Sequence, residues 1–205
     1  MGRKDAPTPP GPARAGRAPA GVPREVRIIG GQWKRTKLAV ADKPGLRPTP
    51  DRVRETLFNW LGHDLAGWRC VDAFAGTGAL GLEAASRGAS DVLLVEQDPD
   101  LVSQLRAVQA RLGATTVKIE RANGLSVLAR LAPASVDLIF LDPPFDANLF
   151  DKALAAAASA VAAEGRIYLE APSRWDDAVL AGHGLVCLRH LKAGAVHAHL
   201  LGRAA

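Results

Sequence analysis

Cysteine is scarce in this chain of 205 residues, and no hydrophobic segment is long enough to cross a membrane. The 2 cysteines, Cys70 and Cys187, are far apart, which favours neither a disulfide framework nor a zinc site. No apolar run approaches the ~20 residues that span a bilayer, and no apolar core of a secretory signal follows the basic N-terminus. The 5 histidines lack the spacing of metal ligands. We therefore expect a cytoplasmic protein with no metal and no membrane partner.

The net charge of +5 is concentrated at the front of the chain. Residues 1–54 contain 13 Lys/Arg and 4 Asp/Glu, whereas residues 55–205 contain 13 and 17. This asymmetry predicts a polyanionic partner that the front of the chain docks, with a catalytic body behind it. The alternative is a solvated basic tail without a partner.

Composition and periodicity divide the chain into three regions. Residues 1–23, rich in Pro, Gly, Ala and Arg, predict a disordered basic tail, and residues 24–48 predict a β ribbon that turns at Gly30 and Gly31. Residues 49–205 alternate between strands and helices, which predicts an α/β domain with a mostly parallel sheet and helices on both faces. The expected strands are 70–74, 91–96, 116–120, 136–141 and 165–170, followed by an antiparallel hairpin of 185–192 and 196–201. The expected helices are 50–62, 82–88, 100–112, 125–131 and 148–163, with Thr49 as the N-cap of the first.

Cations and one tryptophan gather on the predicted ribbon and at the start of the first helix. Such a set fits phosphate contacts and base stacking, although Trp33 has an equally good alternative in packing the ribbon onto the main domain. For the arginines that precede and begin the helix, a solvated face is the alternative. The candidate nucleic-acid contacts are Arg27, Trp33, Lys34, Arg35, Lys37, Arg47 and Arg52.

A glycine-rich turn, residues 75–81, follows the strand 70–74. Glycines at positions 76, 78 and 81 permit a tight turn, a close approach of backbone to ligand, and close helix packing. Glu96 ends the next strand 20 positions after Gly76, where its carboxylate can accept both hydroxyls of a ribose. This pattern predicts a site for an adenosine-containing cofactor, and by itself it fits a methyl donor and NAD equally well.

A second motif, Asp142-Pro-Pro-Phe145, ends the buried strand 136–141. Because proline cannot continue a ladder, the carbonyls of Asp142 and Pro143 lose their partners within the sheet and become acceptors for a ligand. One carboxylate, free carbonyls and an aromatic ring suit a nucleobase amino group, whose two N–H bonds they accept while Phe145 stacks on the base. The alternative is a strand end followed by a Pro-Pro turn, with Asp142 capping a helix.

The two motifs together favour a methyl donor over NAD, because hydride transfer needs neither the Asp142 motif nor the basic front. Asn123, at the end of the strand 116–120, is a candidate for the adenine edge; its alternative is an ordinary Asn-Gly turn. An NAD-dependent oxidoreductase remains the main rival interpretation.

Four separated motifs resemble the RsmD family of bacterial methyltransferases. They are Arg27-Ile-Ile-Gly-Gly-Gln-Trp33, the segment 46–60, the segment 72–84 and Asp142-Pro-Pro-Phe145, and the resemblance runs from about Arg24 to the C-terminus. It implies a class I S-adenosylmethionine-dependent methyltransferase fold (Rossmann-like) with seven strands, the last antiparallel. It also implies that the target base is held by Asp142, Pro143, Pro144 and Phe145, and the donor by Asp72, Phe74, Ala75, Gly76, Gly78, Glu96, Gln97, Asn123, Gly124 and Asp142.

The same resemblance implies the reaction, which is methylation of guanine N2 in 16S rRNA of the small ribosomal subunit or its assembly intermediate, by a monomer. The tetrapeptide alone indicates only an amino nitrogen, since related enzymes with Asn-Pro-Pro-Tyr act on adenine or cytosine. A DNA amino-methyltransferase and a non-catalytic RNA-binding assembly factor therefore stay open.

Overall fold

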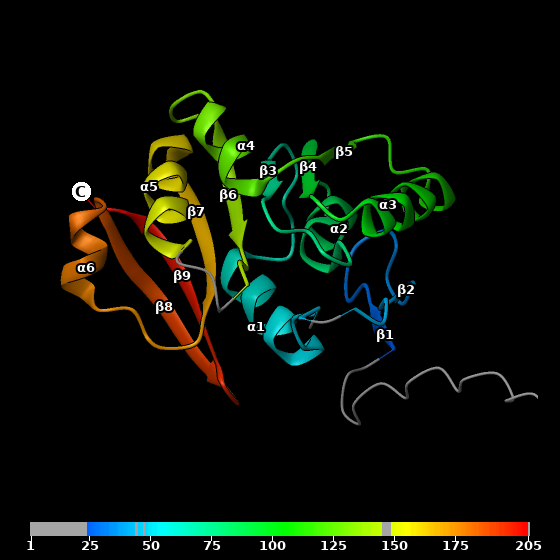
Figure 1. The fold of residues 1–205 in the computed structure, drawn as a ribbon, viewed down its shortest axis with the longest axis horizontal. Helices are drawn as coiled ribbons and strands as arrows, with labels where there is room; N and C mark the ends of the chain where they lie inside the picture. Colours follow the sequence, from blue (N-terminus) through cyan, green and yellow to red (C-terminus); the bar gives the residue numbers. More distant parts are fainter. Residues whose placement is uncertain (1–23, 44, 47, 145–148, 205) are drawn as a thin grey trace, which may run out of the picture.

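The computed structural model describes residues 24–43, 45–46, 48–144 and 149–204. The predicted tail (1–23) and the candidate residues Arg47 and Phe145 lie outside this part of the chain. The described residues form a two-stranded ribbon and a seven-stranded sheet with helices on both faces (Figure 1).

The main sheet has the strand order β5-β4-β3-β6-β7-β9-β8. The strands β3 to β7 run parallel, and β9 is antiparallel to both β7 and β8, so the predicted terminal hairpin and the mostly parallel sheet are confirmed. Apolar runs form the central strands because these are covered on both faces. The bounds are β3 (Arg69–Asp72), β4 (Asp91–Glu96), β5 (Val117–Arg121), β6 (Val136–Leu141), β7 (Val161–Ala171), β8 (Leu185–Ala193) and β9 (Val196–Arg203).

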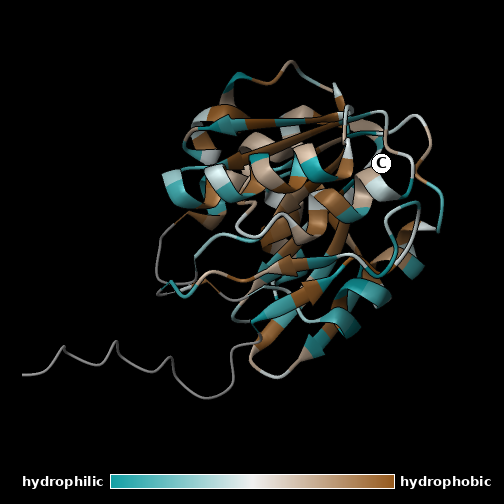
Figure 2. Cartoon of the chain, turned by 90° about the vertical axis from the view of Figure 1, so that its right-hand side faces the viewer, coloured by the Kyte–Doolittle hydropathy of each residue, from teal (hydrophilic) through white to brown (hydrophobic). Residues whose placement is uncertain are grey.

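Two clusters of apolar side chains, one on each face, hold the helices to the sheet. One cluster includes residues of α1, α2 and α3, and the other includes residues of α4, α5 and α6. In Figure 2 the hydrophobic colour follows the strands and the inward helix faces, while the outer faces are largely hydrophilic. The helices are α1 (Asp51–Leu61), α2 (Ala79–Ser86), α3 (Pro99–Leu112), α4 (Gly124–Arg130), α5 (Phe150–Ala160) and α6 (Asp177–Gly182).

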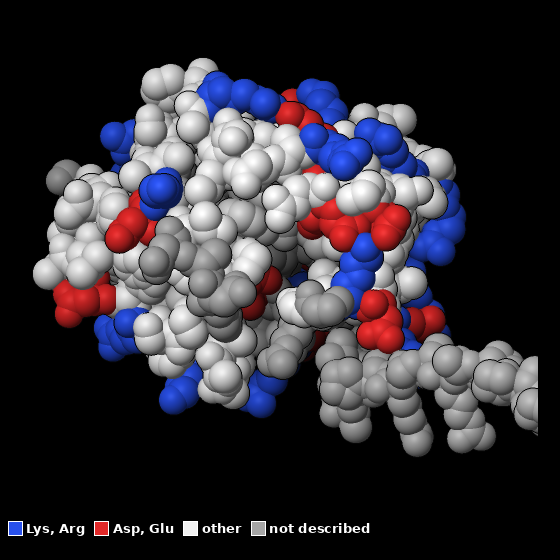
Figure 3. All heavy atoms as spheres, viewed as in Figure 1, with Lys and Arg blue, Asp and Glu red and all other residues white. Residues whose placement is uncertain are grey.

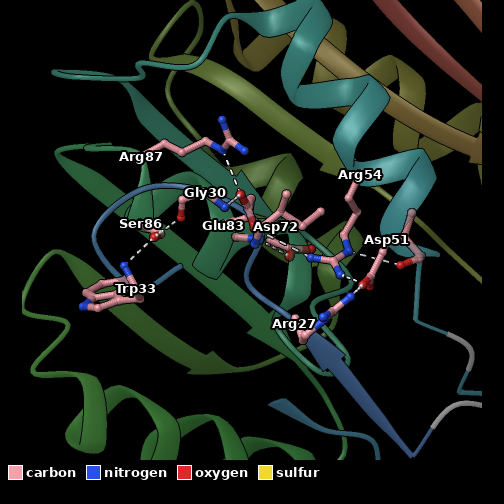
Figure 4. A network of polar contacts seen from close by, with 12 residues as sticks. Arg27, Gly30, Trp33, Asp51, Arg54, Asp72, Glu83, Ser86 and Arg87 are labelled. Atoms are coloured by element: carbon pink, nitrogen blue, oxygen red, sulfur yellow. Dashed lines mark hydrogen bonds and ion pairs between the residues drawn. The ribbon is translucent and has the colours of Figure 1, made fainter. Parts of the chain in front are cut away.

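The N-terminal ribbon consists of β1 (Glu25–Arg27) and β2 (Lys37–Ala39), paired antiparallel. It is shorter than predicted, because residues 28–36 form the turn region between the strands rather than extending them. Hydrogen bonds fasten this turn to α2: the Gln32 amide donates to the Ser86 carbonyl at 2.8 Å, and the Trp33 amide donates to Ser86 Oγ at 3.0 Å (Figure 4). At Gly31, with φ of 71°, a Cβ would lie 1.8 Å from the Ser86 carbonyl oxygen, so only glycine fits this contact.

Glu83 of α2 is the buried anion of the same junction. Its carboxylate accepts from the amides of Ile29 at 2.6 Å and Gly30 at 2.8 Å, and from Arg87 Nε at 2.8 Å (Figure 4). Arg54 Nη1 lies 3.7 Å from Glu83 Oε2, and neither side chain is exposed. The ribbon is therefore attached to the main domain through one α2 carboxylate with two buried arginines beside it.

Two local predictions were wrong, and one helix was missed. Thr49 does not cap α1, because its hydroxyl donates to Glu170 instead and Pro50 occupies the N-cap position without a side-chain bond. The predicted helix 148–163 ends at Ala160, and residues 161–163 begin β7, which is bonded to β6 from Val161 onward. Sequence analysis also missed the short helix α6.

Candidate active site

The two sequence motifs lie side by side at the carboxyl edge of the sheet, where α/β proteins bind ligands. Asp72 of β3 pairs with Phe140 of β6, and the Ala73 amide donates to the Phe140 carbonyl at 3.2 Å. The glycine turn after β3 and the Asp142 motif after β6 therefore leave adjacent strand ends. Figure 3 shows this side of the molecule hollowed near its middle, with acidic side chains visible inside.

The glycine turn leads directly into α2, and two of its glycines have backbone angles in the left-handed region. Gly76 has a φ of 51° and Gly78 a φ of 77°, and the Gly78 amide donates to the Ala75 carbonyl at 2.6 Å. The Asp72 carboxylate accepts from the Gly81 amide at 3.0 Å, and a Cβ at Gly81 would lie 2.2 Å from a Leu94 methyl. The prediction that glycine permits close packing of this helix is confirmed, and Asp72 holds the turn in place.

Glu96, at the end of β4, reaches this turn. Its Oε2 accepts from the Gly76 amide at 2.9 Å, and its Oε1 accepts from the amides of Gln97 at 2.8 Å and Asp98 at 2.9 Å. A carboxylate offers about four lone-pair sites, so three donors leave room for a further one. The backbone thus holds the Glu96 carboxylate beside the turn and leaves it an acceptor site for a ligand.

The third element of the candidate cofactor site is the start of α4. Asn123 is the N-cap of this helix, and its Oδ1 accepts from the Ser126 amide at 3.2 Å. This favours the local-turn alternative for its carbonyl oxygen, while its side-chain NH₂ remains available to an adenine edge. A Cβ at Gly124 would lie 2.1 Å from the Ala73 carbonyl oxygen and 3.2 Å from Phe74, so glycine brings α4 against the first strand end.

Asp142 and Pro143 present the acceptors that sequence analysis predicted. Within the described residues, no backbone amide donates to the carbonyl of either residue, and no hydrogen bond reaches the half-buried Asp142 carboxylate. The alternative role of Asp142 as a helix cap is wrong, because α5 begins at Phe150 and its N-cap position is Leu149, without a side-chain bond. Pro143 is buried and Pro144 is exposed.

Burial is the main cause of a raised pKa at three carboxylates near the ends of β3, β6 and β7. Removal from water, then the charges of Glu170 and Asp72, raises the pKa of Asp142 well above its usual value. Burial raises the pKa of Asp72 to about 7, against hydrogen bonds from Gly81 and Phe74 that lower it. Burial also raises the pKa of Glu170, and hydrogen bonds from Thr49 and Tyr168 offset part of the rise. Asp142, which lacks such bonds, is the carboxylate best prepared to accept a proton.

The connector between ribbon and α1 follows the same edge, which the sequence did not indicate. Lys43 Nζ lies 2.7 Å from Asp98 and 2.8 Å from Asp100, beyond the end of β4. Leu46 faces Gly76, since a Cβ there would meet a Leu46 methyl at 3.1 Å, and Thr49 Oγ1 donates to Glu170 at 2.5 Å. The connector is therefore a wall of the candidate site.

The candidate nucleic-acid contacts divide into paired and unpaired cations. Arg27 lies 3.3 Å from Asp51, and Lys37 lies 2.8 Å from Glu25, both on the surface. Lys34, Arg35 and Arg52 are exposed, and the described part of the chain gives them no ion-pair partner. Trp33 is half-buried and packs against the core, which favours the packing alternative for its ring.

Glu83, Ser86 and Arg87 are the structural residues that sequence analysis missed. A signal existed, because Glu83 is the only charged residue in α2, whose other members are Ala, Leu, Gly and Ser. A cavity of about 420 Å³ lies at this junction, lined by Gly30, Gly31, Lys34, Asn59 and Arg87 among others; it includes no strand-end residue.

Among the described residues, no group of three or more His, Cys, Asp or Glu side chains is placed to hold a metal ion. His190 Nε2 and His197 Nδ1 lie 3.0 Å apart on the terminal hairpin. His199 of β9 is fully buried; burial lowers its pKa to about 4, and its Nε2 accepts from the Trp175 amide at 3.2 Å. No helix in the described chain is long and apolar enough to span a bilayer.

The sheet order, the glycine turn after the first parallel strand and the acidic end of the second define the class I methyltransferase fold. Residues 26–202 match the model of the family described as "Conserved hypothetical protein 95". The chain belongs to this family, the RsmD family that its motifs resemble.

Relatives and solved structures agree with this membership. The Ribosomal RNA small subunit methyltransferase D of Escherichia coli (strain K12) is 47% identical over 130 residues, which cover 63% of this chain and 65% of that protein. The protein of the same name from Haemophilus influenzae is 44% identical over 133 residues, covering 63% and 69%. The solved structure of yhhF from Escherichia coli is 36% identical and covers 88% of this chain and 99% of that one, with a TM-score of 0.76. The aligned segment thus spans just under two thirds of the first relative's length.

Proposed function

We propose that this protein transfers a methyl group from S-adenosylmethionine to the exocyclic N2 of a guanine in 16S rRNA of the small ribosomal subunit. One observation carries the proposal: the free acceptors of Asp142 and Pro143 directly follow β6, which pairs with β3, the strand that opens into the glycine turn. The names of the relatives, which describe methyltransferases of small-subunit rRNA, support this substrate. A monomer acting in the cytoplasm on the subunit or its assembly intermediate belongs to the same proposal.

The residues around the glycine turn fit S-adenosylmethionine. Gly76 and Gly78 give the close backbone approach, Glu96 keeps an acceptor site for a ribose hydroxyl, and Asn123 with Gly124 borders the place for the adenine. When bound, the cofactor supplies an electrophilic methyl group on a sulfonium. Because this methyl group is intrinsically reactive, the protein's main contribution is to align the target nitrogen with it.

Asp142 and Pro143 would prepare that nitrogen. The lone pair of an exocyclic amino group is delocalised into the base, and two acceptors that hold its two N–H bonds draw the lone pair back onto nitrogen and aim it. Asp142 would accept one N–H and the Pro143 carbonyl the other, while Phe145 would stack on the ring. The raised pKa of Asp142 then suits it to take the proton that the nitrogen must lose after transfer.

Asp142→Ala tests this assignment. The variant is expected to bind S-adenosylmethionine nearly normally in calorimetry and to lose methyl transfer to unmethylated small subunits by about 10²–10³-fold. The matched control is Asp137→Ala, which removes a carboxylate from the same strand, in an exposed ion pair with Arg69. Turnover of the Asp142 variant at the rate of the control would refute the role. Methylation of duplex DNA in preference to subunits would support the DNA alternative, and binding of NADH in preference to S-adenosylmethionine would support the oxidoreductase.

A further inference from the structure

Glu170 is a buried carboxylate that the proposed mechanism does not yet use. It lies on β7, whose residues Tyr168 and Leu169 pair with Phe140 and Leu141 of β6. One step further along both strands, Glu170 stands beside Asp142. Residues opposite one another on adjacent parallel strands share a face, and adjacent strands are about 4.8 Å apart. Glu170 is only 3% exposed, so the two carboxylates border the same small space.

One oxygen of Glu170 is fixed by two donors. Oε1 accepts from Thr49 Oγ1 at 2.5 Å and from the Tyr168 hydroxyl at 2.8 Å. Thr49 is itself held, because its carbonyl accepts from Nε of the buried Arg54 at 3.2 Å. The ring of Tyr168 packs edge-on against Phe140, with centroids 6.3 Å apart. Thr49 of the connector and Tyr168 of β7 therefore fix the orientation of the Glu170 carboxylate.

The other oxygen, Oε2, accepts no hydrogen bond from the described residues. Burial raises the pKa of Glu170 but the charge of the buried Arg54 lowers it, so an anion at this position also balances a buried cation. The two hydrogen bonds on Oε1 leave Oε2 as the acceptor for a further donor. A free acceptor held rigidly beside the candidate base-binding residue is what recognition of a donor requires.

The bases that carry an amino group differ in the ring atom next to it. In guanine the neighbour of the amino group is N1–H, a donor, whereas in adenine and cytosine it is a ring nitrogen with a lone pair. A carboxylate only accepts, so it binds the guanine edge and repels the other two. We propose that Glu170 is the residue that selects guanine, its Oε2 accepting N1–H while Asp142 accepts from N2. This inference rests on the proposed function and explains which base it acts on.

The test uses small subunits or rRNA fragments in which the target guanine is replaced by 2-aminopurine. This analogue keeps the 2-amino group, but its N1 carries a lone pair in place of the hydrogen. The wild-type protein is expected to methylate the guanine substrate with a kcat/KM about 10- to 100-fold above that of the analogue. In Glu170→Gln the side-chain amide can donate to the lone pair, so the ratio should fall to within a few-fold of one.

The control is Glu164→Gln, an exposed glutamate on the same strand, which should keep the wild-type ratio. A purely structural role for Glu170 would lower both rates together and leave the ratio unchanged, and that result would overturn the inference. If Glu170→Gln does not fold, the wild-type ratio alone decides, since equal rates on guanine and 2-aminopurine exclude an N1–H contact. Absence of any methyl transfer to the guanine substrate would contradict the proposed function itself.

Discussion

Replacement of Glu83 by alanine tests how the ribbon is attached to the main domain. The substitution removes the carboxylate that accepts from the amides of Ile29 and Gly30 and from Arg87. It also leaves Arg54, whose side chain is 0% exposed, with Asp51 at 2.6 Å but without the second carboxylate, which lies 3.7 Å away. The ribbon and the start of the main domain should therefore loosen together.

The expected magnitude follows from burial. The Arg87 side chain is 6% exposed and that of Glu83 is 0% exposed, so this is a buried ion pair and not a surface one. Breaking such a pair by removing one partner costs about 3–5 kcal/mol, because the remaining charge is left uncompensated. For a chain of this size that corresponds to a fall in Tm of roughly 6–20 °C.

The assay is denaturant unfolding followed by the fluorescence of the 4 tryptophans, one of which, Trp33, lies in the turn region held by α2. The matched control is Glu25→Ala, which removes an anion paired with Lys37 on the surface of the ribbon and should cost about 0–1 kcal/mol. A loss below about 1 kcal/mol for Glu83→Ala would show that the buried carboxylate is not what fastens the ribbon.

Two further predictions concern charge. Lys34→Gln with Arg35→Gln should weaken RNA binding and reduce the slope of log K against log salt by up to about 1.5, because both cations lack ion-pair partners among the described residues. The control double variant, Arg27→Gln with Lys37→Gln, should change the slope less, because both of these cations are already paired. An unchanged slope in both variants would leave the basic ribbon without a role in binding. Asp72→Asn should become more stable relative to the wild type as pH rises from about 4 to about 7. Burial raises the pKa of Asp72 from an ordinary 3.8 to about 7, so the folded wild type binds this proton more tightly than the unfolded chain does. The wild type therefore loses stability over that interval, and the asparagine variant does not. The upper bound of the gain is ~4 kcal/mol, from about 1.4 kcal/mol per unit of pKa, and parallel pH–stability curves for variant and wild type would contradict the account.

The sheet was predictable because its strands carry their own signal. The runs of β4 and β6 are apolar and are bounded by turn residues, so their positions follow from local sequence, and β4 has the predicted bounds. The end of the helix after Phe150 was not predictable in this way. Alanine-rich sequence favours helix through residue 163, and pairing of Val161 with Val136 of β6 overrides that preference.

Proximity of the two motifs could be expected from the sequence, but the side-chain partners could not. Parallel strands bring their carboxyl ends to one edge whatever the residues are, so Glu96 and Asp142 were found from their positions alone. Thr49 has a strong local preference for capping, which loses to a buried hydroxyl–carboxylate bond with a residue 121 positions away. Glu83 likewise bonds to amides more than 50 positions earlier, and such contacts leave no periodic pattern in the sequence.

The central claim is that an amino group of guanine in 16S rRNA receives a methyl group at Asp142. The most direct measurement is mass-spectrometric mapping of modified nucleosides after incubation of the full chain with S-adenosylmethionine and unmethylated small ribosomal subunits. We predict a single new N2-methylguanosine, absent when Asp142→Ala replaces the wild type. Methylation of adenine or cytosine, or no new methyl group on the RNA, would contradict it.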